Sequence, residues 1–536
     1  MHMLLHHYKI WGIKQSWFSK QTIFTTQFIC SDILLHNSFA SFIVAMVSET
    51  TELHFVLFPL MAQGHMIPMM DISRLLAQRG AVVTIFTTPK NASRFNSVLS
   101  RAVSSGLQIR LLQQHFPAKE VGLPEGCENL DMMTSMDMIN KMYNAINMLQ
   151  KSAEELFEAL TPKPSCIISD LCFPWTAQLA EKHHIPRISF HGFSCFCLHC
   201  MHQLHINSEV CESIISESEY FTIPEIPDQI QVTKEQIPLM IPRSNEEKIF
   251  SEQVREAEKK SYGVIINTFE ELEKAYVRDF KKVKNNKAWF IGPVSLCNKD
   301  GLDKIERGNQ ASISEHRCLK WLDVQQPKSV VYVCFGSICN LIPSQLVELA
   351  LALEDTKRAF VWVIREGRQF QELENWISEE GFEERTKGRG LIIRGWAPQV
   401  IILSHPSIGG FLTHCGWNST LEAISGGVPL VTWPMFGDQF LNEKLVTHVL
   451  KIGVSVGAEV PLKWGEGEEE KRGVMVKKDD IKKGICMVMD EDGEESKERR
   501  ERLIKMSEMA NRAVQEEGSS HLALTSLIQH IMQQSG

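Results

Sequence analysis

Histidine, aspartate and hydroxyl residues recur in this sequence directly after short apolar runs. Ala62-Gln63-Gly64-His65 follows the run 54–58, and Asp170 follows the run 166–169. A histidine, with an ordinary pKa of about 6.5, can take a proton from a hydroxyl, and an aspartate on its other ring nitrogen would fix the tautomer. A single loop histidine is more often a surface or packing residue. Because Gly64 permits close backbone approach and Asp170 supplies a partner, we expect His65 and Asp170 to form a catalytic dyad.

The segment 409–422, GGFLTHCGWNSTLE, carries a second polar group. Its pattern predicts a strand, a glycine turn and a helix whose first turn contains Asn418 and Ser419. Free N–H groups and hydroxyls at a helix N-terminus bind anions, so we expect a diphosphate there, with His414 as a further donor. The alternative is that these residues only cap the helix. A metal or thiol site at His414 and Cys415 is disfavoured because no further cluster of ligands accompanies them.

Positioning these residues requires parallel sheets, because short apolar runs alternate with amphipathic segments in both halves of the chain. In the first half we expect strands at 54–58, 81–86, 166–169 and 186–190, and helices from near Pro68 and over 175–183. The polar segment 298–314 is predicted to be a linker. Beyond it we expect strands at 329–334, 360–364, 390–393, 408–412 and 429–432, with helices over 343–354 and 497–514.

Ligands of such sheets bind beyond the carboxyl ends of the strands. In the second half, those positions hold Gly336-Ser337, Trp396, His414 and Asp438-Gln439. We therefore expect one polar site in each half.

Composition narrows the class of protein. The chain has 536 residues, 43% of them hydrophobic and 23% charged, which is typical of a globular protein with two or more domains. A net charge of −9 without a basic, aromatic-rich stretch disfavours nucleic acid as a partner. The 14 cysteines are scattered, and we interpret them as free thiols, mostly in the core.

No apolar run is long enough to span a membrane, so we expect a soluble cytoplasmic protein without stable membrane insertion. Residues 1–45 lack the basic, apolar and small regions of a signal peptide and end just before a second possible start, Met46. We interpret them as an N-terminal extension outside the family pattern that was introduced by the gene model or by cloning; an unprocessed signal is the alternative.

Many residues between 396 and 439 together resemble the signature box of plant secondary-product UDP-glycosyltransferases. These are Trp396-Ala397-Pro398-Gln399, His405, Gly409-Gly410-Phe411, His414-Cys415-Gly416-Trp417-Asn418-Ser419, Glu422, Gly427-Val428-Pro429, Trp433-Pro434 and Asp438-Gln439. The resemblance extends from Met46 to the C-terminus. It implies the GT-B fold, an α/β architecture of two facing Rossmann-like, doubly wound domains. The acceptor would bind the domain 46–297 and the UDP-sugar the domain 315–536.

The resemblance also implies a role for each matching residue. The indole of Trp396 would stack on uracil, the backbone of Ala397 would pair with the uracil edge, and the ribose hydroxyls would be held by Gln399 and Glu422. The phosphates would be contacted by Ser337, His414, Asn418 and Ser419. The sugar would be contacted by Trp417, Trp433, Asp438 and Gln439. In this family, Gln439 and Trp417 favour UDP-glucose, whereas histidine at the last position often accompanies UDP-galactose.

The implied reaction is a single inverting displacement that forms a β-O-glucoside, with His65 as the base. It requires no metal and no cofactor besides the donor. We expect a monomer that acts on a small lipophilic acceptor. The segments 130–146 and 190–202 are expected to line the acceptor pocket, although each of them could equally be core. Resemblance to one plant subgroup favours a triterpenoid, flavonoid or hormone.

Two other classes are weighed against this one. A dehydrogenase with a doubly wound fold is disfavoured because residues 59–68 lack GxGxxG after the first strand. A catalytically silent sugar-nucleotide-binding paralogue remains the alternative, and the presence of both His65 and Asp170 argues against it.

Overall fold

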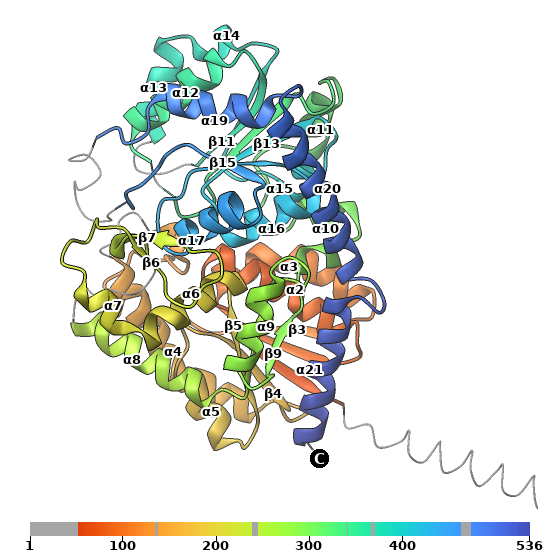
Figure 1. Cartoon of the computed structure of the whole chain (residues 1–536). Helices are drawn as coiled ribbons and strands as arrows, with labels where there is room; N and C mark the ends of the chain where they lie inside the picture. Colours follow the sequence, from red (N-terminus) through yellow and green to blue (C-terminus); the bar gives the residue numbers. More distant parts are fainter. Residues whose placement is uncertain are drawn as a thin grey trace, which may run out of the picture. The chain divides into compact units, whose positions relative to one another are not determined.

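The computed structural model describes residues 52–133, 138–237, 245–339, 341–365, 370–462 and 473–535. The expected N-terminal extension, residues 1–45, lies outside the described residues. Two parallel sheets organise the described part of the chain, one on either side of segment 298–314 in the sequence (Figure 1).

The first sheet has the strand order β3-β2-β1-β4-β5-β8-β9. Its strands are β1 (His54–Phe58), β2 (Val82–Thr87), β3 (Ile109–Gln113), β4 (Cys166–Asp170), β5 (Arg187–His191), β8 (Gly263–Ile266) and β9 (Ala288–Phe290). Four of them, β1, β2, β4 and β5, match the expected strands within about a residue. The other three were not predicted, because short apolar runs such as that of β8 occur equally in buried helices and loops.

The second sheet has the order β12-β11-β10-β13-β14-β15. Its strands are β10 (Val330–Cys334), β11 (Ala359–Ile364), β12 (Gly390–Arg394), β13 (Ile408–Thr413), β14 (Leu430–Thr432) and β15 (Gly453–Ser455). Five of the six were expected. The edge strand β15 was missed because its three residues carry no periodic signal.

Helices alternate with the strands of the first sheet. They are α2 (Gln63–Ala77), α3 (Pro89–Ser104), α4 (Ile139–Glu158), α5 (Thr176–Lys182), α6 (Cys195–Ile206), α7 (Ser208–Ser213), α8 (Asn245–Lys260) and α9 (Lys274–Val283). The prediction that the first helix begins near Pro68 was wrong, since α2 begins at Gln63 and contains that proline. At this sixth helical position proline removes the hydrogen bond to the Gly64 carbonyl, which the Asn418 side chain replaces.

The helices of the second half are α10 (Gly301–Ile305), α11 (Glu315–Asp323), α12 (Pro343–Asp355), α13 (Phe370–Glu379), α14 (Phe382–Arg385), α15 (Gln399–Leu403), α16 (Trp417–Gly426), α17 (Gln439–Lys444), α19 (Lys478–Met489), α20 (Glu494–Ala513) and α21 (Ser519–Ser535). Short pieces complete the chain: β6 (Phe221–Thr222), β7 (Gln231–Val232), η1 (Leu130–Met132), η3 (Lys234–Gln236), η4 (Val294–Cys297) and η5 (Leu445–Val449). Segment 298–314, expected as a linker, contains α10.

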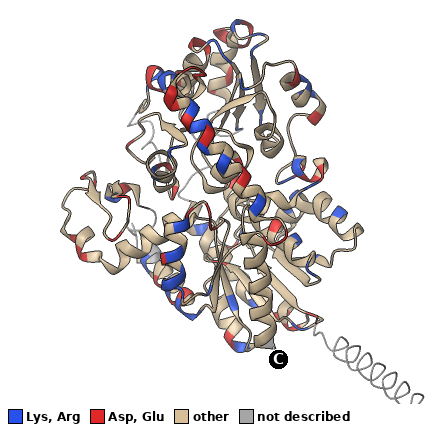
Figure 2. Cartoon of the chain, turned by 45° about the vertical axis from the view of Figure 1, so that its right-hand side comes forward, with Lys and Arg blue, Asp and Glu red and all other residues tan. Residues whose placement is uncertain are grey.

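Two helices close the chain where one was expected. The expected helix is α20, which packs on α16 and carries interspersed basic and acidic residues (Figure 2). The additional helix, α21, returns to the first sheet and contacts β9 (Figure 1). Within the described residues, none of the helices combines the length and the apolar character that crossing a membrane would require.

Strand β1 of the first sheet is buried on both faces, as a strand covered by helices on both sides requires. Phe55 and Leu57 of β1 belong to an apolar cluster with Ile72 of α2 and Leu527 of α21. Val56 and Phe58 belong to a second cluster on the other face, with α4. Burial of these two apolar layers fixes the register of the strands, because a slip of one residue would turn each side chain to the opposite face. The register in turn fixes where each strand ends.

Candidate active site

The polar residues of both halves lie where the strand order reverses. In the first sheet β1 and β4 are neighbours, and in the second β10 and β13 are neighbours. His65 follows β1 and Asp170 ends β4, whereas Ser337 follows β10 and His414 follows β13. A reversal of strand order leaves space beyond the carboxyl edge for a ligand. The topology therefore places each expected group of polar residues at the ligand-binding edge of its sheet.

His65 and Asp170 are hydrogen-bonded. The His65 Nδ1 atom lies 2.5 Å from Asp170 Oδ2, and the Cys172 N–H donates to Asp170 Oδ1 at 3.0 Å. The carboxylate is fully buried, whereas the imidazole is 21% exposed. With Nδ1 donating its proton to Asp170, Nε2 keeps a lone pair that can accept one. The dyad therefore has the geometry of a histidine base oriented by a carboxylate.

Burial and nearby carboxylates shift the pKa of His65 in opposite directions. Burial lowers the pKa of His65, but the Asp170 carboxylate and, more weakly, Asp438 of the second half outweigh it, so the pKa is raised. Gly192 lies beside the ring, since a Cβ added there would be 3.3 Å from His65 Cε1. A raised pKa makes His65 a stronger base once it is neutral.

Pro68 explains a contact between the two halves. Proline has no N–H, so the carbonyl four residues earlier in α2, that of Gly64, receives no helical hydrogen bond from it. Instead the Asn418 Nδ2 group donates to Gly64 O at 2.6 Å. Asn418 Oδ1 in turn accepts from Asn267 Nδ2 at 3.3 Å. Asn418, expected at the phosphates, thus also ties the first turn of α16 to the first turn of α2, which carries His65.

His414 is enclosed by glycines. A Cβ at Gly336 would lie 2.6 Å from His414 Nε2, and one at Gly416 would also clash with the ring. Gly336 has φ +75, a conformation that favours glycine. Burial lowers the pKa of His414 to about 4, so its ring is neutral near pH 7. Ser337 is half-buried in the same turn.

The two residues expected at the ribose, Gln399 and Glu422, are hydrogen-bonded to each other. Gln399 begins α15 and its Nε2 group donates to Ser419 Oγ at 3.0 Å and to Glu422 Oε2 at 2.8 Å. Trp396 and Ala397 precede α15 in the loop that follows β12. Ala397 is buried and Trp396 half-buried. The structure therefore brings together the side chains for which the resemblance implies ribose contacts.

Two tryptophans expected at the sugar are buried. Trp417 is 2% exposed and its Nε1 group donates to Asn267 O of the first half at 2.7 Å. Trp433 packs edge-on against Phe335, with ring centroids 5.4 Å apart. Trp417 thus contacts the first half directly, whereas Trp433 packs within the second half.

Asp438 and Gln439 begin α17 within a hydrogen-bonded network. The Gln439 Oε1 atom accepts from the backbone N–H of Met435 at 2.9 Å, which leaves its amide NH₂ group for another partner. Asn442 Nδ2 donates to Asp438 Oδ2 at 2.6 Å. Burial raises the pKa of Asp438 to about 6. The carboxylate therefore acts electrostatically on His65 from the second half.

Sequence reasoning missed residues that join the halves. Ser194 Oγ donates to Asn442 Oδ1 at 3.0 Å, and Gln63 Nε2 donates to Asn309 Oδ1 at 2.9 Å. Asn442 was detectable in principle, because it lies one helical turn after Asp438. Asn309 lies in the segment expected as a linker and carried no signal.

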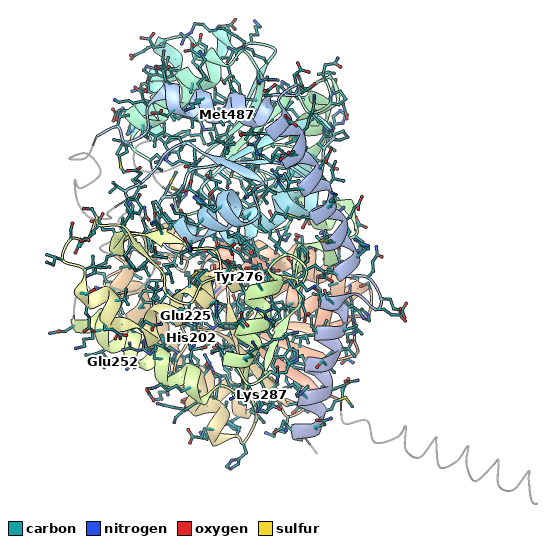
Figure 3. The ribbon with its side chains drawn as sticks, viewed as in Figure 1. His202, Glu225, Glu252, Tyr276, Lys287 and Met487 are labelled. Carbon is teal, nitrogen blue, oxygen red and sulfur yellow. The ribbon has the colours of Figure 1, made fainter. Side chains whose placement is uncertain are left out.

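Segment 190–202, expected near the acceptor, contributes mainly to the core. Cys195, Cys197 and Cys200 of α6 are free and fully buried. Phe196 packs edge-on against Tyr276 of α9, with centroids 4.9 Å apart. Tyr276 and His202 of α6 are labelled in Figure 3. The alternative that this segment is core thus holds for these residues. Among the described residues, no group of three or more His, Cys, Asp and Glu side chains is arranged to hold a metal ion.

Comparisons with known proteins agree with this arrangement. The family model described as UDP-glucoronosyl and UDP-glucosyl transferase matches residues 55–461. The chain belongs to this UDP-glycosyltransferase family. The glycosyltransferase is 55% identical to UDP-glycosyltransferase 73C11 of Barbarea vulgaris over 492 residues, 91% of this chain and 99% of that protein. It is also 55% identical to UDP-glycosyltransferase 73C5 of Arabidopsis thaliana over 493 residues, 91% and 99% of the two chains.

Similarity to solved structures identifies the fold. Glycyrrhiza uralensis UGT73P12, complexed with glycyrrhetinic acid 3-O-monoglucuronide, is similar with a TM-score of 0.82 and 36% identity, over 90% of this chain and 96% of that one. Arabidopsis thaliana UGT89C1, complexed with UDP-L-rhamnose, gives 0.70 and 30%, over 90% and 100%. The fold of this glycosyltransferase is GT-B, as its motifs predicted.

Proposed function

We propose that the chain is an inverting glucosyltransferase that moves glucose from UDP-glucose to a hydroxyl of a small lipophilic plant metabolite in the cytoplasm. The acceptor is a triterpenoid, a flavonoid or a hormone. The observation that carries this proposal is the His65–Asp170 dyad, with a hydrogen bond of 2.5 Å and with the donor half's Asp438 acting on the same histidine.

The chemistry follows from this arrangement. His65 Nε2 takes the proton of the acceptor hydroxyl while the oxygen attacks the anomeric carbon from the side opposite UDP. The bond from that carbon to UDP breaks with its electron pair on the leaving phosphate oxygen, so an α-linked donor gives a β-glucoside. Asp170 stabilises the imidazolium, which then releases its proton to solvent.

The leaving diphosphate has partners in the second half. The N-terminus of α16 offers N–H groups without helical acceptors, and its first turn contains Asn418 and Ser419. The neutral His414 follows the end of β13, and Ser337 follows the end of the neighbouring strand β10. Donors aimed at the oxygen on which charge develops stabilise the transition state more than the ground state.

The choice of sugar and acceptor is supported by two residues of the signature box and by the ligand of a related structure. Gln439 at the last box position and Trp417 favour glucose by family resemblance. The aglycone of the compound bound to UGT73P12 is a triterpenoid, which supports that acceptor class for this chain. UGT89C1 was solved with UDP-L-rhamnose, so other donors belong in any test.

The test incubates the full chain with UDP-glucose, UDP-galactose, UDP-glucuronic acid or UDP-L-rhamnose, each with a panel of triterpenoids, flavonoids and plant hormones. UDP release and product mass are followed, and proton NMR assigns the anomer. We expect one acceptor class to gain a single β-linked hexose, with UDP-glucose as the preferred donor.

The His65→Ala variant separates binding from turnover. It should bind UDP as the unmodified chain does and lose transfer by about 10²-fold or more. Full activity in that variant would refute the base assignment. UDP binding by the unmodified chain without transfer to any acceptor would instead favour the silent paralogue, and a different preferred sugar would correct the donor alone.

A further inference from the structure

Segment 298–314 does more than connect the two halves. Arg307, which follows α10, is only 9% exposed, and its guanidinium contacts carboxylates from both halves. Its Nη1 group pairs with Glu422 of α16, and its Nη2 and Nε groups lie 2.8 and 2.9 Å from Asp71 Oδ2 of α2. Arg307 therefore links the helix that begins at the dyad histidine to the helix that begins at the expected diphosphate site.

The three charges are buried together. The side chains of Asp71 and Glu422 are 4% and 6% exposed. Such a group is weak evidence of a device for stability, since burying ions costs about as much as their attraction returns. Two carboxylates around one guanidinium also leave one negative charge without a cationic partner in this group. A contribution to stability therefore does not by itself explain this group.

The Glu422 carboxylate is oriented from two sides. Arg307 engages Oε1, and Gln399 Nε2 donates to Oε2 at 2.8 Å. A carboxylate can accept about four hydrogen bonds, so both oxygens keep capacity for hydroxyl donors. The guanidinium is planar and rigid, which suits it to fixing a carboxylate at one angle.

The same segment also fixes Trp396. Gly308 has φ +102, and a Cβ there would lie 2.6 Å from Trp396 Cζ2, so only glycine lets the backbone approach the indole this closely. Further on, the Ser312 N–H donates to Trp396 O and the Trp396 N–H donates to Ser312 Oγ, both at 2.8 Å. The segment thus holds the ring and the backbone of the residue expected to stack on uracil.

We propose that residues 307–312 are part of the nucleotide-binding site, and that Arg307 is a positioning residue that holds Glu422 for the ribose hydroxyls. This inference rests on the proposed donor site. The contrary possibility is that Arg307 occupies the place of the ribose and must leave before UDP binds. The two differ in sign, because loss of a positioning residue weakens UDP binding whereas loss of an occluding one strengthens it.

The test compares UDP with 2′-deoxy-UDP by titration calorimetry on the full chain. The unmodified chain should prefer UDP, because only UDP donates its 2′-hydroxyl to Glu422. In Arg307→Met the affinity for UDP should fall about tenfold and the preference over 2′-deoxy-UDP should shrink toward one, the scale of a hydrogen bond to a charged group. Arg307→Lys should recover part of both. In steady state, KM for the donor should rise more than KM for the acceptor.

Arg74→Met is the matched control. Arg74 lies on α2, is about as buried as Arg307, and pairs with Asp303 of the same segment at 2.5 Å. Its loss removes an ion pair between the segment and α2 without touching Glu422. We expect a lower Tm with the UDP preference unchanged.

Glu422→Gln completes the design. It should remove the 2′-hydroxyl preference by itself, and adding Arg307→Met should change that preference no further, because both changes act on one contact. Should Arg307→Met fail to fold, Arg307→Lys and Glu422→Gln carry the same comparison. Unchanged or tighter UDP binding in the folded Arg307 variants would overturn the inference. Absence of UDP binding by the unmodified chain would refute the donor site itself.

Discussion

Replacing Asp170 by asparagine tests the dyad most directly, because the structure fixes how the new amide must lie. The Cys172 N–H donates to Oδ1 at 3.0 Å, so the asparagine oxygen stays there and its NH₂ group takes the place of Oδ2, facing His65 Nδ1. That NH₂ group is a donor and favours the tautomer in which Nδ1 accepts and Nε2 carries the proton. In this tautomer Nε2 cannot accept a proton from the acceptor hydroxyl.

The cost of restoring the active tautomer can be worked out. It forfeits the hydrogen bond from the asparagine NH₂ group to Nδ1, about 0.5–1.5 kcal/mol between neutral groups, and leaves two buried donors facing each other, about 1–3 kcal/mol for each. The sum raises the barrier by roughly 2.5–7.5 kcal/mol, or about 10²–10⁵-fold in rate. We expect kcat to fall in this range, with donor KM changed by less than about threefold, since the Asp170 carboxylate is hydrogen-bonded to His65 and Cys172 of the first half.

The pH profile supplies an independent readout. Asp170 raises the pKa of His65 against burial, so the Asp170→Asn variant should lower that pKa. Because the base must be neutral, the acidic limb of kcat/KM should move to lower pH. Initial rates of UDP release from pH 5.5 to 9, with saturating UDP-glucose, measure both effects.

Asp323→Asn is the matched control for this variant. Asp323 Oδ1 lies 3.1 Å from His405 Nε2, so the change removes a histidine–carboxylate contact that precedes β13, at the opposite edge of that sheet from its carboxyl end. Its rate should stay within about twofold of the unmodified chain, as for other exposed changes. A rate for Asp170→Asn within threefold of the unmodified chain, with an unmoved acidic limb, would refute the reasoning.

Three further outcomes are expected. Because the pKa of His414 is lowered to about 4 in the folded protein, the unfolded chain binds a proton at this residue first as the pH falls. The free energy of unfolding should therefore decrease by roughly 2–3 kcal/mol between pH 6.5 and pH 4.5. Urea unfolding measures this dependence, and an equal dependence in His414→Gln would contradict the reasoning. Leu527→Ala, in the buried face of α21, should lower the free energy of unfolding by about 2–5 kcal/mol. Leu522→Ala, at an exposed position of the same helix, should lower it by less than about 0.5 kcal/mol. Equal urea midpoints for the two variants would be inconsistent with that packing. Gly336→Ala should weaken UDP binding about tenfold, because the new Cβ would displace the His414 ring. Gly388→Ala is the control, since it carries similar backbone strain (φ +81) in open space and should leave UDP binding unchanged. Equal UDP affinities of the two variants would exclude the clash with His414.

Much of the fold was predictable because its signals are local. Short apolar runs bounded by glycine and polar residues read as buried strands, and nine expected strands correspond to β1, β2, β4, β5, β10, β11, β12, β13 and β14. The contact between His65 and Asp170 could be anticipated for the same reason, since residues after neighbouring parallel strands share one sheet edge. Which residues touch donor or acceptor stays a prediction.

Local patterns also misled in identifiable ways. Pro68 suggested a helix start because proline favours the first helical turn, yet α2 begins at Gln63. The helix tolerates proline there because Asn418, from the other half, satisfies the carbonyl that proline leaves without its helical hydrogen bond. Nothing near residue 68 in the sequence announces that partner.

By itself the sequence determined the periodic elements, the order of the two sheets along the chain and the identity of the polar residues at their strand ends. The tertiary structure alone decided how the halves are joined: Asn418 on Gly64, Ser194 on Asn442, and Arg307 between Asp71 and Glu422. Secondary structure repeats with a period that residues a few positions apart reveal. Contacts between residues more than 100 positions apart depend on how two packed sheets come together, and no local pattern encodes that geometry.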